Sequence, residues 1–107
     1  TTEARKKYYI LQGRRYFAQQ QWQKALAAFD TVLEIDPKDT EAIFHIGMAN
    51  IQLGNAQAAK DAFDRVLAIN PKDYSARLNL GNLYFDSREY EKAREQFQYI
   101  IDHAEGQ

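Results

Sequence analysis

Side chains that could catalyse a reaction or hold a metal ion are few and scattered in this sequence of 107 residues. The two histidines, His45 and His103, stand about half the chain apart, and neither belongs to a His-x-x-x-His or similar ligand spacing. Ser75 and Ser87 have neither a neighbouring histidine nor the Gly-x-Ser-x-Gly turn of a nucleophile. There is no cysteine, and the glycines stand singly rather than in a phosphate-binding loop. We therefore expect no enzymatic activity, no metal site and no cofactor.

The residue types that remain suit the recognition of another protein. Phe44, Met48 and Ile51 recur at helical spacing and form an apolar stripe separate from Ile43 and Ile46 on the same segment. One helix cannot bury both stripes against a single neighbour. The second stripe either packs between adjacent structural units or forms an apolar groove for an extended peptide or an amphipathic helix, with an adaptable methionine at its centre.

Polar side chains elsewhere could hold such a peptide in place. Asn79 and Asn82 carry carboxamides, which offer both donors and acceptors to a peptide backbone. The Arg14 guanidinium could bind a carboxylate through two parallel hydrogen bonds. His45 could add a pH-sensitive contact one turn from Glu41, although an exposed helical histidine without a role is the simpler interpretation.

The overall charge disfavours nucleic acid as a partner. The 14 Lys and Arg residues and 15 Asp and Glu residues give a net charge of -1, without the strong positive potential of a phosphate-binding protein. We interpret an early basic cluster as a solvated helix face, with RNA binding as the minor alternative; it comprises Arg5, Lys6, Lys7, Arg14 and Arg15. No apolar run approaches the roughly 18 residues of a membrane span, so we expect no direct membrane contact.

The compartment in which the protein resides is left open. Without cysteines the sequence carries no sign of an oxidising or a reducing environment. No apolar signal segment follows Thr1, and we interpret the chain as an excerpt or processed form of a longer protein. We favour the cytoplasm, while the periplasm and a membrane-tethered parent protein stay open.

The elements that must position these side chains repeat with a constant period of 34 residues. Gly13, Gly47 and Gly81 are spaced by this step, and so are the two prolines, Pro37 and Pro71. The same step relates three further sets of residues: Ala25, Ala59 and Ala93; Phe29, Phe63 and Phe97; Val32, Val66 and Ile100. Whole stretches of sequence recur at this step, and the chain is therefore predicted to contain three copies of one unit.

Each unit is predicted to consist of two helices, because its apolar residues recur at helical spacing on both sides of a turn. Gly54 suits the left-handed conformation that ends a helix, Pro71 stops the next one, and Asp73 can cap the helix after it. The glycines within the first helices are expected to allow close packing by the alanine and phenylalanine of the second. Six helices are predicted, near residues 6–19, 22–35, 40–53, 56–69, 74–87 and 90–103.

Together, the period and the recurring Gly, Ala, Phe and Pro positions resemble the tetratricopeptide repeat family. The resemblance covers residues 6–39, 40–73 and 74–107, with residues 1–5 as an N-terminal helix extension. Asn50 departs from the pattern, since Tyr16 and Tyr84 are aromatic at the same place. The resemblance implies an all-α fold, a right-handed solenoid of three antiparallel helix pairs forming one domain, whose first helices line a concave surface.

The resemblance also implies which residues face a ligand on that concave surface. The peptide-binding candidates are Ile10, Arg14, Phe17, Phe44, His45, Met48, Ile51, Leu78, Asn79, Asn82 and Phe85, and Lys7, Leu11, Glu41, Gln52, Ser75 and Asp86 share the same face. Some family members clamp the C-terminal carboxylate of chaperones with lysines, asparagines and an arginine. The corresponding residues here retain at most one cation, so a chaperone tail is not the expected ligand; they are Ile10, Arg14, His45, Ser75 and Asn79.

The function expected from these observations is that of a scaffold or adaptor, which binds a peptide or an amphipathic helix in the concave groove and helps to assemble a protein complex. The alternative is a structural module that forms homo-oligomers through its C-terminal repeat. Repeat arrays normally need a polar cap, and no further amphipathic helix follows to cover Ile100 and Ile101.

Overall fold

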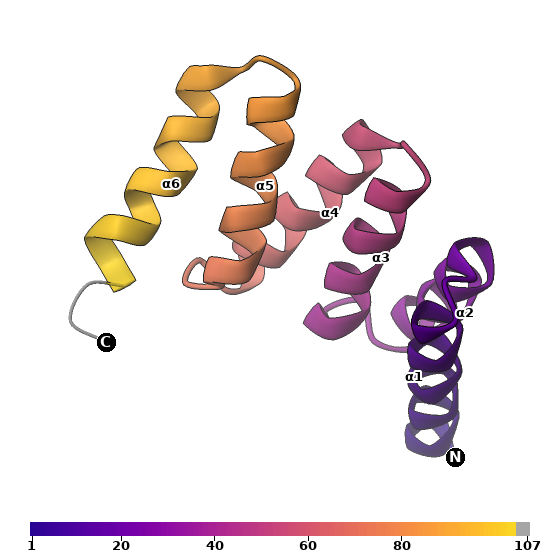
Figure 1. Ribbon diagram of the computed structural model, residues 1–107. Coiled ribbons are helices and arrows are strands. Elements are labelled where there is room, and N and C mark those ends of the chain that lie inside the picture. The colour runs from indigo at the N-terminus through magenta and orange to yellow at the C-terminus, as the bar shows by residue number, and fades with distance from the viewer. Residues whose placement is uncertain (105–107) are drawn as a thin grey trace.

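The computed structural model describes residues 1–104, which are arranged as six α-helices joined by short turns (Figure 1). Residues 105–107, the end of the predicted third repeat, lie outside the described part of the chain. The helices are α1 (Thr2–Ala18), α2 (Trp22–Ile35), α3 (Thr40–Gln52), α4 (Ala56–Ile69), α5 (Tyr74–Asp86) and α6 (Tyr90–Ala104).

The helices follow one another in chain order along an elongated array, from α1 and α2 at one end to α5 and α6 at the other (Figure 1). Each helix packs on the next one along the chain, and α1 also contacts α3 directly. The array measures 43 × 29 × 20 Å. This arrangement is an all-α solenoid, as the repeat pattern predicts.

Helix ends lie where the local chemistry of the sequence places them. The Asp39 and Asp73 side chains cap α3 and α5 by accepting hydrogen bonds from the backbone N–H groups of Ala42 and Ala76, at 3.0 and 2.9 Å. Gly54 ends α3 with a φ of +79°. The first helix begins at Thr2, within the expected N-terminal extension of residues 1–5, and the Thr1 hydroxyl caps it by accepting a hydrogen bond from the Ala4 N–H group.

The core of each pair is a phenylalanine ring set against a glycine, as the spacing predicts. A Cβ atom at Gly47 would lie 2.8 Å from Phe63 Cζ, so the glycine makes room for the ring. Phe29 and Phe63 are completely buried, whereas Phe97 in the last pair is half-buried.

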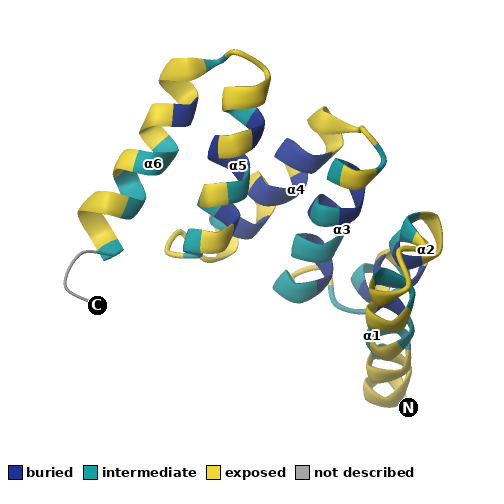
Figure 2. Cartoon of the chain, in the orientation of Figure 1, coloured by how far each residue is buried: buried dark blue, intermediate teal, exposed yellow. Residues whose placement is uncertain are grey.

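Two apolar clusters join these pairs into one body. The larger cluster spans α3, α4 and α5, and the smaller one spans α1, α2 and α3. In contrast, α6 contributes one buried residue, Ala93, among its described residues. Figure 2 accordingly shows α3 and α4 with most of their inner faces buried, and α1 and α6 largely exposed at the two ends.

Candidate protein-binding surface

The first helices of the three pairs, α1, α3 and α5, carry all the predicted peptide-binding residues. Of these residues, Ile10, Arg14 and Phe17 lie on α1, and Leu78, Asn79, Asn82 and Phe85 lie on α5. Phe44, His45, Met48 and Ile51 lie on α3 between them. The exposure of these side chains differs strongly from one helix to the next.

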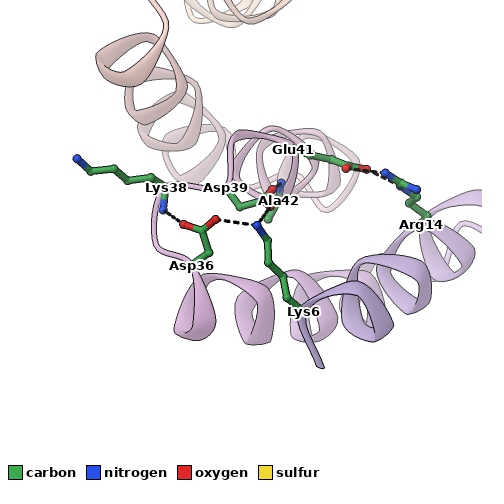
Figure 3. A network of polar contacts seen from close by, with 7 residues as sticks. All are labelled: Lys6, Arg14, Asp36, Lys38, Asp39, Glu41 and Ala42. Atoms are coloured by element: carbon green, nitrogen blue, oxygen red, sulfur yellow. Dashed lines mark hydrogen bonds and ion pairs between the residues drawn. The ribbon is translucent and has the colours of Figure 1, made fainter. Parts of the chain in front are cut away.

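Arg14 already binds a carboxylate within the chain. Its Nε and Nη2 atoms donate to Glu41 Oε2 and Oε1 at 2.5 and 2.7 Å, which joins α1 to α3 (Figure 3). The guanidinium keeps the pKa of the Glu41 carboxyl below its usual value, since hydrogen bonding and charge both favour the ionised form. The bidentate contact predicted for Arg14 is thus made by Glu41.

A second ion pair supports the same junction from the other end of α1. Lys6 Nζ lies 2.8 Å from Asp36 Oδ2 and 3.1 Å from Asp39 Oδ2, so it bridges two carboxylates of the α2–α3 turn (Figure 3). These two partners raise the pKa of Lys6, and Lys6 in turn lowers the pKa of Asp36. Two cations of the basic cluster, Lys6 and Arg14, are therefore engaged in structural ion pairs.

His45 is half-buried among aromatic rings, and the expectation of an exposed histidine is wrong. Its ring stacks on Phe29 with a centroid separation of 4.9 Å and meets the edge of Phe17, also at 4.9 Å. Its Nδ1 atom lies 2.9 Å from the Glu41 carbonyl oxygen. His45 therefore fills a slot between Phe17 and Phe29 at the junction of the first two pairs.

The apolar stripe of α3 is half-buried rather than fully open to solvent. Phe44, Met48 and Ile51 pack against the larger core cluster, and the Phe44 ring lies 5.4 Å from that of Phe63. Ile10 and Phe17 pack against the smaller cluster in a similar way. Packing between units thus takes up part of this stripe, and the part that remains accessible is smaller than the sequence suggested.

The predicted residues of α5 are more exposed. Leu78 is 50% exposed, and Asn82, one turn further along the helix, is also exposed. Asn79 is half-buried and donates from Nδ2 to the Ser75 carbonyl oxygen at 2.9 Å. Leu78 and Asn82 together present an apolar side chain and a carboxamide on the same face.

Phe85 faces the C-terminal edge of the array. It is 57% exposed, and its ring meets the Tyr90 ring at 5.4 Å. The two rings line a cavity of about 300 Å³ together with Arg94, Phe97, Gln98 and Ile101. The sequence indicated an open edge near Ile101 but did not connect Phe85 and Tyr90 with it. Comparison at the 34-residue step would have done so, because Phe17 and Trp22 occupy the same places in the first repeat.

The N-terminal edge carries a different surface, which sequence reasoning missed. A cavity of about 470 Å³ lies between α1 and α2. Its lining combines tyrosines with two cations: Tyr8, Tyr9, Gln12, Arg15, Tyr16, Lys24, Ala27, Ala28 and Thr31. Arg15 and Lys24 both lie over the Tyr16 ring, at 5.2 and 5.8 Å from its centroid.

The repeat pattern and the solenoid define a class of protein, an array of stacked helix pairs in which each pair contacts its neighbours. Two tetratricopeptide repeat family models match the chain, over residues 12–68 and 50–106. Because each match covers more than half of the sequence, the chain belongs to the tetratricopeptide repeat family. No curated protein matches the sequence.

Solved structures share the fold. The crystal structure of MamA superimposes with a TM-score of 0.85 and 27% identity, and the match covers 91% of this chain and 57% of MamA. The TPR2B domain of yeast Sti1, in complex with pHsp70, gives a TM-score of 0.83 at 19% identity over 89% of this chain and 76% of that one. The first TPR of Spaghetti (RPAP3), bound to the HSP90 peptide SRMEEVD, gives 0.85 at 17% identity over 92% and 79%.

Within residues 1–104, no group of three or more His, Asp or Glu side chains is placed so that it could hold a metal ion. None of the six described helices is both long and apolar enough to cross a membrane.

Proposed function

We propose that the chain is a non-catalytic protein-interaction module, which binds a peptide or an amphipathic helix on the face formed by α1, α3 and α5. The observation that carries this proposal is the pairing of exposed Leu78 with exposed Asn82, one turn apart on α5. An apolar side chain of a ligand can be buried against Leu78, while the Asn82 carboxamide can donate to and accept from the ligand backbone.

The chemistry of the face favours a ligand with an apolar centre over an acidic one. The Arg14 guanidinium already binds Glu41 through two hydrogen bonds, so a ligand carboxylate would have to displace Glu41 to bind Arg14. Two proteins of the same fold are seen with Hsp70 or an HSP90 peptide, which supports peptide binding as the mode. The residues at the chaperone-clamp positions are different here, and we do not propose a chaperone tail as the ligand.

The test is an affinity selection of peptides from a proteome library, with the parent chain beside two charge variants. We expect the parent to enrich a common apolar or amphipathic motif and Leu78→Glu to lose it, because a carboxylate would be buried against the apolar ligand. The structure makes Leu78 a better choice than Met48, since Met48 packs against the core and a charge there would endanger the fold.

Ile101→Glu serves as the matched control, because Ile101 is 60% exposed and lines the cavity at the C-terminal edge, which Leu78 does not line. It should enrich the same peptides as the parent. If Leu78→Glu retained the motif, or if no motif were enriched at all, the assignment of the ligand to this face would be abandoned.

A second candidate function is self-association, and the C-terminal edge favours it. Phe85, Tyr90 and Ile101 are all more than half exposed and gather around one cavity. An apolar surface of this kind at the end of a repeat array is normally covered. We propose that it binds a second copy of the chain, so that association depends on protein concentration.

A further inference from the structure

We propose that two copies of the chain associate head to tail, with Leu11 of one copy seated in the aromatic slot between Phe85 and Phe97 of the other. The inference rests on the second candidate function above. It identifies the surface of the second copy that binds to the C-terminal edge. It extends an interface that the chain already contains twice, at the junctions of α2 with α3 and of α4 with α5.

The first internal junction is the template. There, His45 of the second repeat fills the slot between Phe17 and Phe29 of the first repeat, with both ring separations at 4.9 Å. Two steps of 34 residues lead from Phe17 to Phe85 and from Phe29 to Phe97. The third repeat therefore carries the same pair of phenylalanine rings as the first.

The third repeat offers this slot to solvent. Phe85 and Phe97 line the cavity of about 300 Å³, with Tyr90 and Ile101 at its sides. Ile101 corresponds to Leu33, which packs against both core clusters at the first junction. Phe85 and Ile101, at positions that a following repeat covers inside the chain, are thus apolar and more than half exposed among the described residues.

Leu11 is the side chain that corresponds to His45, because it lies 34 residues before it. It is 61% exposed, the largest exposed fraction among the large apolar side chains of the described residues. A leucine side chain gains hydrophobic stabilisation in proportion to the apolar area that such a slot removes from water. The two ends of the chain therefore carry the two halves of one apolar contact.

Polar contacts of the internal junctions also have compatible counterparts at this interface. The Arg14–Glu41 pair of the first junction has its counterpart in Asn82 of one copy and Lys7 of the next. The carboxamide oxygen of Asn82 can accept a hydrogen bond from the ammonium group of Lys7. Lys60 binds Glu89 at 2.9 Å at the second junction. This pair corresponds to Arg94 of one copy and Gln21 of the next, and the guanidinium can donate to the amide oxygen.

Two further features bear on the contact between copies: the distribution of charge along the chain and the size of Tyr8. Residues 1–34 hold six Lys and Arg against three Asp and Glu, whereas the third repeat, residues 74–107, holds four against six, so the two ends of the chain carry net charges of opposite sign. Tyr8 takes the place of the fully buried Ala42 and Ala76. The contact between two copies must therefore accommodate a larger side chain at this position than the junctions within the chain do.

The arrangement does not close on itself in pairs. Each copy carries one slot at its C-terminal edge and one Leu11 at its N-terminal repeat, so the interface is heterologous, and association continues beyond a dimer. This property separates it from a two-fold pairing of C-terminal edges, which would stop at two chains.

The experiment uses sedimentation velocity on the parent chain and on Leu11→Glu and Ile101→Glu, alone and mixed. The parent should form species larger than two chains as its concentration rises from about 1 μM to about 1 mM, a range suited to weak interfaces. Each variant alone should weaken association by about tenfold or more, because a carboxylate would be buried in the apolar slot. Both substituted positions are exposed, and circular dichroism verifies that the variants stay folded.

The mixture provides the decisive measurement. Leu11→Glu retains an intact slot and Ile101→Glu retains an intact Leu11, so an equimolar mixture should form a dimer and stop there. Leu78→Glu is the matched control and should associate like the parent, although it is expected to lose peptide binding.

Three results would overturn the proposal, and they are distinguishable. A parent chain that stays monomeric throughout the range would remove self-association itself. Loss of association in Ile101→Glu but not in Leu11→Glu would leave self-association standing with a different receiving surface, such as a second C-terminal edge. Mixed variants that fail to pair, while the parent associates, would also exclude the head-to-tail contact.

Discussion

At the scale of single residues, the contact between a glycine and a phenylalanine ring holds each helix pair together. A Cβ atom at Gly81 would lie 2.5 Å from Phe97 Cε1, and one at Gly47 would lie 2.8 Å from Phe63 Cζ. By distance alone, Gly81 is the tighter of the two sites. The cost of adding a Cβ atom also depends on whether the ring can move away. Phe63 is completely buried and held in place, whereas Phe97 is half-buried and can shift.

We therefore predict that Gly47→Ala destabilises the chain more than Gly81→Ala does. Alanine gains about 1 kcal/mol of helix propensity over glycine at either position. Overpacking against the fixed Phe63 ring costs about 1–3 kcal/mol and outweighs this gain, whereas Phe97 can shift toward solvent and leave Gly81→Ala near neutral. Urea unfolding of the two variants measures both values. A greater loss in Gly81→Ala would show that the ring of Phe97 is held as firmly as that of Phe63.

At the scale of helices, most of the fold could be predicted from the sequence. The bounds of α2 and α4 agree with the predicted ranges, and those of α3, α5 and α6 differ by one residue, because turn and capping residues act locally. The start of α1 lies in the expected helical extension of residues 1–5, and its exact place is set by the Thr1 hydroxyl cap, a signal that the repeat pattern does not contain.

The candidate site was less predictable, because exposure depends on what packs against each helix. Phe17 and Phe85 occupy the same place in their repeats, but a following pair covers Phe17 and nothing within the described residues covers Phe85. Likewise, Arg14 was predicted to bind a carboxylate, but the periodicity did not indicate that Glu41 would supply it. The apolar pattern of one helix shows which of its faces can be buried, but it does not show which residues of another helix will contact that face.

The two aspartate caps give a prediction at this scale. Asp73→Ala should cost about 1 kcal/mol of stability, the usual contribution of an N-cap. Asp39→Ala should cost more, because Asp39 caps α3 and also lies 3.1 Å from Lys6 Nζ. Thermal unfolding of both variants tests the order. In a Lys6→Met background the excess should disappear, and an excess that persisted there would assign it to another contact.

At the scale of the whole molecule, stability is distributed unevenly along the array. The larger cluster lies in the middle, and α6 has Ala93 as its buried residue within the described range. Repeat arrays are stabilised by each unit and its neighbours, so an end with few buried contacts opens first.

Hydrogen exchange should reveal this gradient. We predict that backbone amides in the middle of α3 and α4 exchange most slowly and that those of α6 exchange fastest among the six helices, since local opening needs less energy where fewer contacts are buried. Helix α1 also has a single buried residue, Gly13, but Lys6 and Arg14 tie it to Asp36 and Glu41. The measurement belongs at low protein concentration, where self-association does not cover the C-terminal edge. Uniform protection of all helices would contradict the gradient and indicate that the three repeats unfold as one cooperative unit.

Trp22 is the single tryptophan, so its fluorescence can report on the cooperativity of unfolding without an added label. Its indole ring meets the Phe17 ring at a centroid separation of 5.0 Å, within the first repeat. Tryptophan fluorescence therefore follows the melting of one end of the array, whereas far-ultraviolet circular dichroism sums over all six helices. Coincident unfolding curves would show that the first repeat unfolds together with the other two, and separated curves would show that it unfolds on its own.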